Sequence, residues 1–191
     1  MDKKKGLIIF APPAVGKTTV AKLYDGVVDL SNSAWRNSLD GKNEKTKSAC
    51  VSNPNWPYNF IPVLEKQKDL FDLTLTAIWA EFVEKPEIKK YLDSKIDYKM
   101  ALPKLTALDR IFKGMKERGN KKDFIDSFKY YYPLIIKEFG SSPETITIED
   151  DEFLEDTLLR RGVLARENRK IWEVSHEQQR TALTIDPGLQ L

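Results

Sequence analysis

Glycine is scarce in this chain of 191 residues. It occurs nine times, whereas an average usage of about 7% would give roughly thirteen. The scarcity excludes a collagen-like chain and a flexible glycine-rich linker. Cysteine is scarcer still, because Cys50 is the only one. A single cysteine excludes an intramolecular disulfide and a cysteine-cluster metal site, and it suits a reducing compartment.

Long apolar runs and a strong excess of either charge are also missing. No run approaches the ~20 residues that a membrane-spanning helix needs. The basic N-terminus followed by Leu7–Phe10 imitates the start of a signal peptide, but the run is too short and Pro12 and Pro13 interrupt it. The 31 basic and 29 acidic residues give a net charge of +2, so no overall field attracts nucleic acid or a membrane surface. We therefore expect a cytoplasmic protein without a membrane partner.

Short apolar segments alternate with helical patterns along the chain. The expected strands are residues 6–10, 27–30, 73–79, 96–102 and 145–148, and the expected helices are residues 16–23, 60–70, 86–92, 105–118, 123–139 and 152–172. This alternation is typical of a parallel sheet with helices on both faces. The sequence therefore predicts a three-layer α/β domain over residues 1–172, followed by a polar tail over residues 173–191.

A phosphate-binding loop is expected between the first strand and the first helix. Residues 11–18, APPAVGKT, match the pattern GxxxxGK[ST] except at its first position. The N–H groups of such a loop surround a polyphosphate, and the helix that follows directs its positive end at the same charge. We expect Lys17 to reach the β- and γ-phosphates of ATP and Thr18 to bind Mg²⁺. The alternative is a strand, turn and helix that happen to contain Gly-Lys-Thr. The expected nucleotide-binding residues are Pro13, Ala14, Val15, Gly16, Lys17, Thr18 and Thr19.

Residues 11–19 resemble the GPPGAGKGT loop of adenylate kinase and other nucleoside monophosphate kinases, with alanines at 11 and 14 where that family has glycines. Over residues 6–130 the chain is similar to small P-loop kinases of bacteriophages, of the deoxynucleoside monophosphate kinase kind. The similar segments are VVDLSNSAW, NPNWPYNFI, Leu102-Pro103 and KERGNKKDFIDSF. The resemblance implies a P-loop NTPase fold with a five-stranded parallel sheet, helices on both faces and a small helical lid over residues 104–122. It also implies ATP and Mg²⁺ as cofactors, a small-molecule nucleotide as substrate and, for a phage protein, the host cytoplasm.

Residues after the second strand are candidates for the acceptor site, because ligands gather at the carboxyl ends of parallel strands. Small-molecule P-loop kinases often have an Asp-x-Asp or Asp-x-Ser element there, which implies that Asp29 and Ser31 position Mg²⁺ or orient the acceptor. Asp29 would act as a base toward an acceptor hydroxyl but only as a positioning group toward a monophosphate; a turn-capping aspartate is the alternative. Arg36 is a candidate ligand for an acceptor phosphate or a solvated surface residue.

The third strand ends without the aspartate that often binds Mg²⁺ in P-loop proteins, and Glu81 is a weak substitute. Trp79 beside it is a candidate substrate contact, with packing in the core as the alternative.

Residues 104–122 carry seven basic and two acidic side chains. The resemblance implies that the arginine before Gly-Asn faces the phosphates, which points to Arg118. Relatives tend to have a second arginine four residues earlier, where this chain has Gly114, so Arg110 or Lys113 would have to replace it. The alternative is a basic helix face in solvent.

The sequence thus predicts an ATP- and Mg²⁺-dependent phosphotransferase that transfers the γ-phosphoryl group of ATP to a (deoxy)nucleoside monophosphate. Its catalytic residues would be Lys17, Arg118, Arg110 and Asp29, with Thr18 and Asp29 at the metal. One alternative is a P-loop kinase that acts on a nucleic-acid 5′-hydroxyl or another small hydroxyl compound, and only then is a nucleic-acid partner expected. Another is a nucleotide-binding protein without turnover, which the altered loop and the missing aspartate favour.

Overall fold

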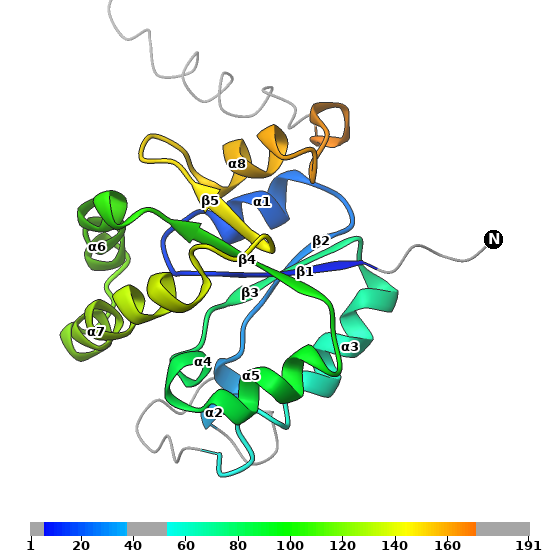
Figure 1. The fold of residues 1–191 in the computed structure, drawn as a ribbon. Helices are drawn as coiled ribbons and strands as arrows, with labels where there is room; N and C mark the ends of the chain where they lie inside the picture. Colours follow the sequence, from blue (N-terminus) through cyan, green and yellow to red (C-terminus); the bar gives the residue numbers. More distant parts are fainter. Residues whose placement is uncertain (1–5, 38–52, 171–191) are drawn as a thin grey trace, which may run out of the picture.

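Five parallel strands form one sheet at the centre of the protein. The computed structural model describes residues 6–37 and 53–170 (Figure 1). The strands lie in the order β2-β3-β1-β4-β5. Their bounds are Leu7–Ala11 for β1, Val27–Leu30 for β2, Leu73–Ala77 for β3, Tyr98–Pro103 for β4 and Thr145–Ile148 for β5. The expected five-stranded parallel sheet is confirmed, and β1, which leads into the predicted phosphate loop, is its central strand.

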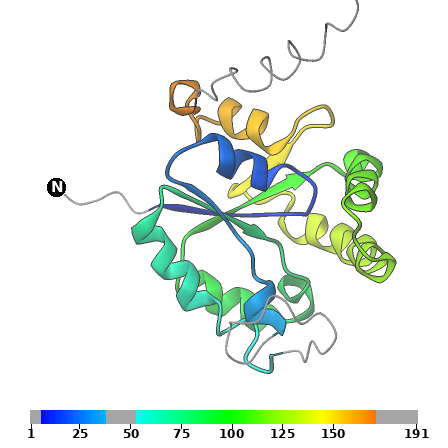
Figure 2. The same cartoon turned by 180° about the vertical axis from the view of Figure 1, so that it is seen from behind.

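Helices cover both faces of this sheet. The two opposite views show α1 (Lys17–Leu23) and α8 (Leu154–Arg160) on one face, and α3 (Ile61–Leu70) and α5 (Pro86–Asp93) on the other (Figure 1, Figure 2). The remaining helices are α2 (Ser33–Asn37), α4 (Glu81–Glu84), α6 (Leu108–Glu117) and α7 (Lys122–Phe139), with short 3₁₀ helices η1 (Leu105–Ala107) and η2 (Arg166–Asn168). The expected lid segment therefore consists of η1, α6 and the turn before α7.

The central strand explains why its sequence is apolar without alternation. Residues 8–11 of β1 are fully buried, because β3 and β4 flank the strand and helices cover it from both sides. The Phe10 ring packs edge-on against Trp79 and Tyr98, with ring centroids 5.0 and 5.3 Å away. This core holds the carboxyl end of β1 in place, and with it the start of the loop.

The last expected helix is wrong in length. α8 ends at Arg160 instead of continuing to residue 172, and the reason is the glycine at 162. Gly162 has a φ of 66°, and the N–H groups of Gly162 and Val163 donate to the carbonyls of Leu159 and Leu158. This is the Schellman pattern that ends a helix at a left-handed glycine.

Smaller differences occur elsewhere. β3 ends at Ala77 rather than at Trp79, and the short helices α2 and α4 were not expected. The predicted polar tail over residues 173–191 lies outside the described residues. Within the described ranges, no helix has both the length and the apolar character that are needed to cross a membrane.

Candidate active site

The loop between β1 and α1 begins with an alanine that fits its position. Ala11 is the last residue of β1, pairs with Ala77 of β3 and is fully buried. Its φ is not positive, so the methyl group at the position of the motif's first glycine causes no backbone strain. Gly16, just before α1, has a φ of 102°, a conformation that favours glycine.

Ala14 is the unusual residue of the loop. Its φ of 61° is the one positive value among the non-glycine residues that the structure describes. An alanine in the left-handed region costs about 1–2 kcal/mol. The helix α6 also approaches the loop here: a Cβ atom added to Gly114 would stand 3.1 Å from the Cβ of Ala14. The glycine at 114 therefore allows α6 to contact the phosphate loop.

Lys17 folds back over the loop. Its Nζ donates hydrogen bonds to the carbonyl oxygens of Ala11 at 3.0 Å and Pro12 at 2.6 Å. Burial lowers the pKa of Lys17 to about 8, with a smaller lowering by the positive charge of Arg118, while the Asp29 carboxylate opposes both. The ammonium group thus lies inside the loop and near a second cation, Arg118. Phosphate oxygens at this place would offset both the loss of hydration and the repulsion between the two cations.

Thr18 and Asp29 form the most direct pair in the site. The Thr18 hydroxyl, at the start of α1, donates to Oδ2 of Asp29 at 2.5 Å, at the end of β2. A hydroxyl and a carboxylate are oxygen ligands of the kind that Mg²⁺ uses, and Mg²⁺ accepts few protein ligands when phosphates and waters supply the rest. No group of three or more His, Cys, Asp or Glu residues suited to a metal occurs in the described part of the chain. Thr18 and Asp29 therefore fit Mg²⁺ held together with a nucleotide, rather than a protein-only metal cage.

A cavity of about 350 Å³ opens beside the loop. We call it the loop cavity. Its lining residues are Ala14, Gly16, Thr19, Arg118, Phe153, Glu155 and Asp156. The exposed Arg118, just after α6, thus lies beside the loop. Thr19 lines the same cavity.

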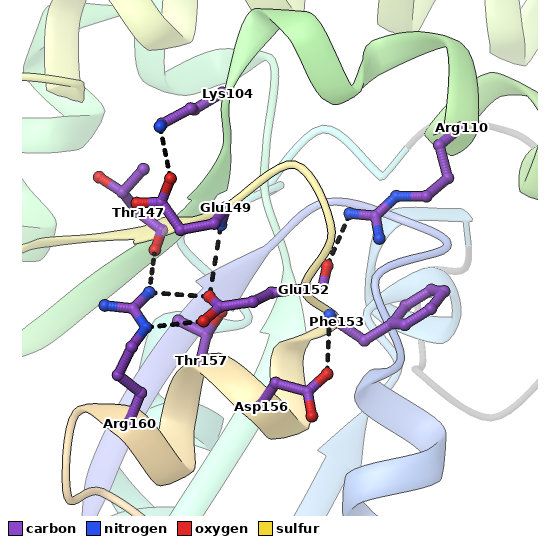
Figure 3. Close-up of polar contacts among 9 residues, drawn as sticks. All are labelled: Lys104, Arg110, Thr147, Glu149, Glu152, Phe153, Asp156, Thr157 and Arg160. Carbon is purple, nitrogen blue, oxygen red and sulfur yellow. Dashed lines mark hydrogen bonds and ion pairs between the residues drawn. The ribbon is translucent and has the colours of Figure 1, made fainter.

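Arg110 lies elsewhere than predicted. Its Nη2 donates to the carbonyl oxygen of Glu152 at 2.6 Å, and its guanidinium lies 4.7 Å from the centroid of the Phe153 ring (Figure 3). In this structure it therefore contacts the turn between β5 and α8, and no contact with the phosphate loop is recorded for it. Lys113, the other candidate, is 79% exposed at its side chain and 4.0 Å from Glu117.

The predicted acceptor residues are divided between surface and core. Ser31 is exposed and shares a 2.9 Å hydrogen bond with Ser33 at the start of α2. Arg36 forms an ion pair with the buried Glu81 at 3.1 Å. Oε1 of Glu81 also accepts a hydrogen bond from Nε1 of Trp56 at 2.8 Å. Glu81 therefore fixes Arg36 and Trp56, whereas the carboxylate that contacts Thr18 belongs to Asp29.

Trp79 corrects the prediction of a substrate contact. It is fully buried, stacks on Phe82 at 5.2 Å and packs edge-on against Trp56 at 5.0 Å. Trp79 lies two residues after the end of β3, and its ring belongs to the aromatic core. Trp79 is thus a core residue in this structure.

Sequence reasoning missed Phe153 and Glu152. Both lie in the turn after β5, at the same sheet edge as the other site residues. The surrounding acidic residues 150–156 are typical of a helix start in solvent, and the Phe153 N–H does donate to Asp156 at 3.1 Å at the start of α8. The available signal was an aromatic residue at the carboxyl end of a strand.

Comparisons with known proteins support the fold. No family model and no curated protein sequence matches the chain. Among solved structures, the tunicamycin resistance protein of Deinococcus radiodurans is similar, with a TM-score of 0.52 and 11% sequence identity over 84% of this chain and 96% of that chain. At this identity the likeness concerns the fold alone. The parallel sheet, its flanking helices and this likeness define an α/β protein with a P-loop NTPase-like fold.

Proposed function

We propose that this protein is an ATP- and Mg²⁺-dependent phosphotransferase that acts on a (deoxy)nucleoside monophosphate. The observation that carries the proposal is the position of Lys17, whose ammonium lies within the loop at the carboxyl end of β1 and at the start of α1. Strand, loop and helix in this arrangement surround a polyphosphate with N–H groups and a lysine. The distant fold likeness supports nucleotide use only in general terms.

Each residue of the site has a separate part in this proposal. Lys17 exchanges its contacts with the Ala11 and Pro12 carbonyls for oxygens of the β- and γ-phosphates. Thr18 and Asp29 hold Mg²⁺, which would neutralise phosphate charge. Arg118 stabilises the charge that spreads over the transferred group. The loop cavity, adjacent to the phosphate loop, accommodates the nucleoside of ATP.

The monophosphate acceptor rests on the sequence resemblance and on Arg36. A guanidinium has five N–H donors, and among the described residues the polar side-chain contact of Arg36 is the one from Nη2 to Glu81. The remaining N–H donors of Arg36 suit a bidentate contact with one phosphate group. Glu81 then holds Arg36 in position from the core side.

A hydroxyl acceptor, either a nucleic-acid 5′-end or a small compound, is the second candidate. The observation in its favour is that the Asp29 carboxylate lies at the strand end and beside Thr18, where a base for an acceptor hydroxyl would be needed. Because the similar structure is that of a tunicamycin resistance protein, tunicamycin is one of the compounds to test.

The test is a phosphotransfer screen with ATP labelled at the γ-phosphate. The acceptors are all nucleoside and deoxynucleoside monophosphates, an oligonucleotide with a 5′-hydroxyl, and tunicamycin. We expect Mg²⁺-dependent transfer to one or a few monophosphates. Transfer only to a hydroxyl compound would replace the first candidate by the second, and ATP binding with no transfer would favour a nucleotide-binding protein without turnover.

A further inference from the structure

Glu152, in the turn between β5 and α8, contacts both helix α8 and helix α6 beside the loop cavity. The carboxylate of Glu152 accepts two hydrogen bonds from Arg160, at 2.7 Å from Nε and 2.8 Å from Nη2, and one from the Thr157 hydroxyl at 2.7 Å. Its backbone carbonyl accepts Nη2 of Arg110 from α6 at 2.6 Å. Figure 3 shows these contacts converging on the turn between β5 and α8.

The arginine of this pair is itself fixed. Nη2 of Arg160 also donates to the Thr147 carbonyl of β5 at 3.2 Å, so a bidentate ion pair joins the end of a sheet strand to the helix that follows it. Hydrogen bonds from Arg160 and Thr157 lower the pKa of Glu152 to about 2, so the carboxylate stays ionised at neutral pH. A bidentate pair of this kind restricts geometry as well as adding attraction.

The two residues after Glu152 contact the loop cavity and the phosphate loop. The Phe153 ring lines the loop cavity and lies under the Arg110 guanidinium, and its Cβ is 4.0 Å from the point where a Cβ on Gly16 would stand. The Leu154 N–H donates to the carbonyl of Val15 in the phosphate loop at 2.9 Å. A shift of this turn therefore moves the cavity wall and one loop contact together.

We propose that the Glu152–Arg160 pair is a positioning element for the nucleoside of ATP: it fixes the turn that presents Phe153, backed by Arg110, as one wall of the loop cavity. The inference rests on the proposed function, because it concerns how the bound ATP is held. Neither side chain lines the cavity. An aromatic ring held by a cation offers a nucleobase a flat surface.

The pair is expected to affect positioning more than stability. The side chain of Arg160 is 41% exposed and that of Glu152 is 17% exposed, and ion pairs near the surface contribute little to the free energy of folding. A matched control is Lys104, after β4, whose side chain pairs with that of Glu149. The contact of Glu149 with Glu152 is made by its backbone N–H, at 3.4 Å from Oε2, so a change of Lys104 leaves it in place. No contact of Lys104 with Phe153 or Arg110 is recorded in the described part of the chain.

The experiment compares ATP with tripolyphosphate, which carries the phosphates without the nucleoside. In the full chain, Arg160→Gln should weaken ATP binding about tenfold by calorimetry and raise KM for ATP similarly, with kcat nearly unchanged. Tripolyphosphate affinity should stay at the wild-type value. Arg160→Lys should recover part of the loss, since lysine keeps the charge but not the bidentate geometry, and Lys104→Gln should behave like the wild type.

Three outcomes would overturn the inference. One is unchanged ATP affinity in a folded Arg160→Gln protein, and another is an equal loss for ATP and tripolyphosphate. The third is a wild-type protein that binds no ATP, which would overturn the proposed function as well and is therefore distinguishable. If Arg160→Gln does not fold, Glu152→Gln, which keeps the side-chain shape, is measured in the same way.

Discussion

The Cβ of Ala14 lies 3.1 Å from the place where a Cβ on Gly114 would stand, so the phosphate loop and helix α6 meet at these two residues. Ala14 has the left-handed backbone that glycine usually supplies, and Gly114 leaves the space that the Ala14 methyl group needs. The two positions should therefore be coupled.

The coupling is testable by a double-mutant cycle on thermal or denaturant unfolding. Ala14→Gly removes the strained alanine and should raise the free energy of unfolding by up to about 1 kcal/mol. Gly114→Ala should gain little or lose stability in the wild type, because its methyl group meets Ala14. In the Ala14→Gly background the same change should stabilise by about 0.5–1 kcal/mol, the usual gain of alanine over glycine in a helix. Additive effects would show that the two residues do not interact.

The lowered pKa of Lys17 gives ATP binding a pH dependence. With a pKa of about 8 in the free protein, Lys17 loses its proton as the pH rises through 8, while phosphates favour the charged form. We expect ATP affinity to fall above pH 8 and binding at pH 8.5–9 to take up a proton, as measured by calorimetry in two buffers with different ionisation heats. Arg118→Gln should move the fall to higher pH, since Arg118 contributes to the lowering.

The lowered pKa of Lys17 gives folding the opposite pH dependence: a rising pH weakens ATP binding but stabilises the folded state. The pKa is lowered from 10.5 to about 8, so between these values the unfolded chain binds more protons than the folded one. The contribution of Lys17 to stability therefore increases as the pH rises from 8 to 10.5. Lys17→Met should remove this increment. A stability curve that is identical for both proteins in this window would contradict the lowered pKa.

The Thr18–Asp29 pair predicts how Mg²⁺ is held. Asp29→Asn keeps the shape but removes a charged oxygen ligand, so the Mg²⁺ concentration for half-maximal activity should rise about tenfold. With a monophosphate acceptor the activity should fall but persist at saturating Mg²⁺. With a hydroxyl acceptor it should fall by about a hundredfold or more, because a base is lost. Asp25→Asn, at the far end of α1, is the matched control and should leave the Mg²⁺ requirement unchanged.

Glu81 is expected to act through Arg36. Glu81→Gln removes the negative charge that pairs with Arg36 but keeps an oxygen acceptor for the Trp56 N–H, so Arg36 should become less ordered. KM for the acceptor should then rise several-fold, while KM for ATP stays constant. Glu87→Gln on the exposed side of α5 serves as the control. An equal rise of both KM values would show that the change disturbs the core rather than the acceptor site.

The sequence was sufficient for those parts of the site that depend on neighbours in the chain. Gly16, Lys17 and Thr18 lie where a strand-loop-helix pattern predicts them, because β1 is buried on both faces and its apolar run shows it. Contacts over long separations were not predictable in this way. Glu81 meets Arg36 across 45 residues and Trp56 across 25, and the place of Trp79 in the core depends on where β3 ends. The length of α8 depended on the left-handed Gly162, which a helical pattern does not reveal.

The central claim is that Lys17 holds the phosphates of ATP for transfer. The most direct measurement compares Mg²⁺-dependent transfer of the γ-phosphoryl group by the wild type, by Lys17→Ala and by Lys22→Ala, which changes an exposed lysine in the same helix. We predict that Lys17→Ala lowers the transfer rate by about a hundredfold or more, with an unchanged circular dichroism spectrum, and that Lys22→Ala transfers at the wild-type rate. A folded Lys17→Ala protein that transfers phosphate as fast as the wild type would contradict the account.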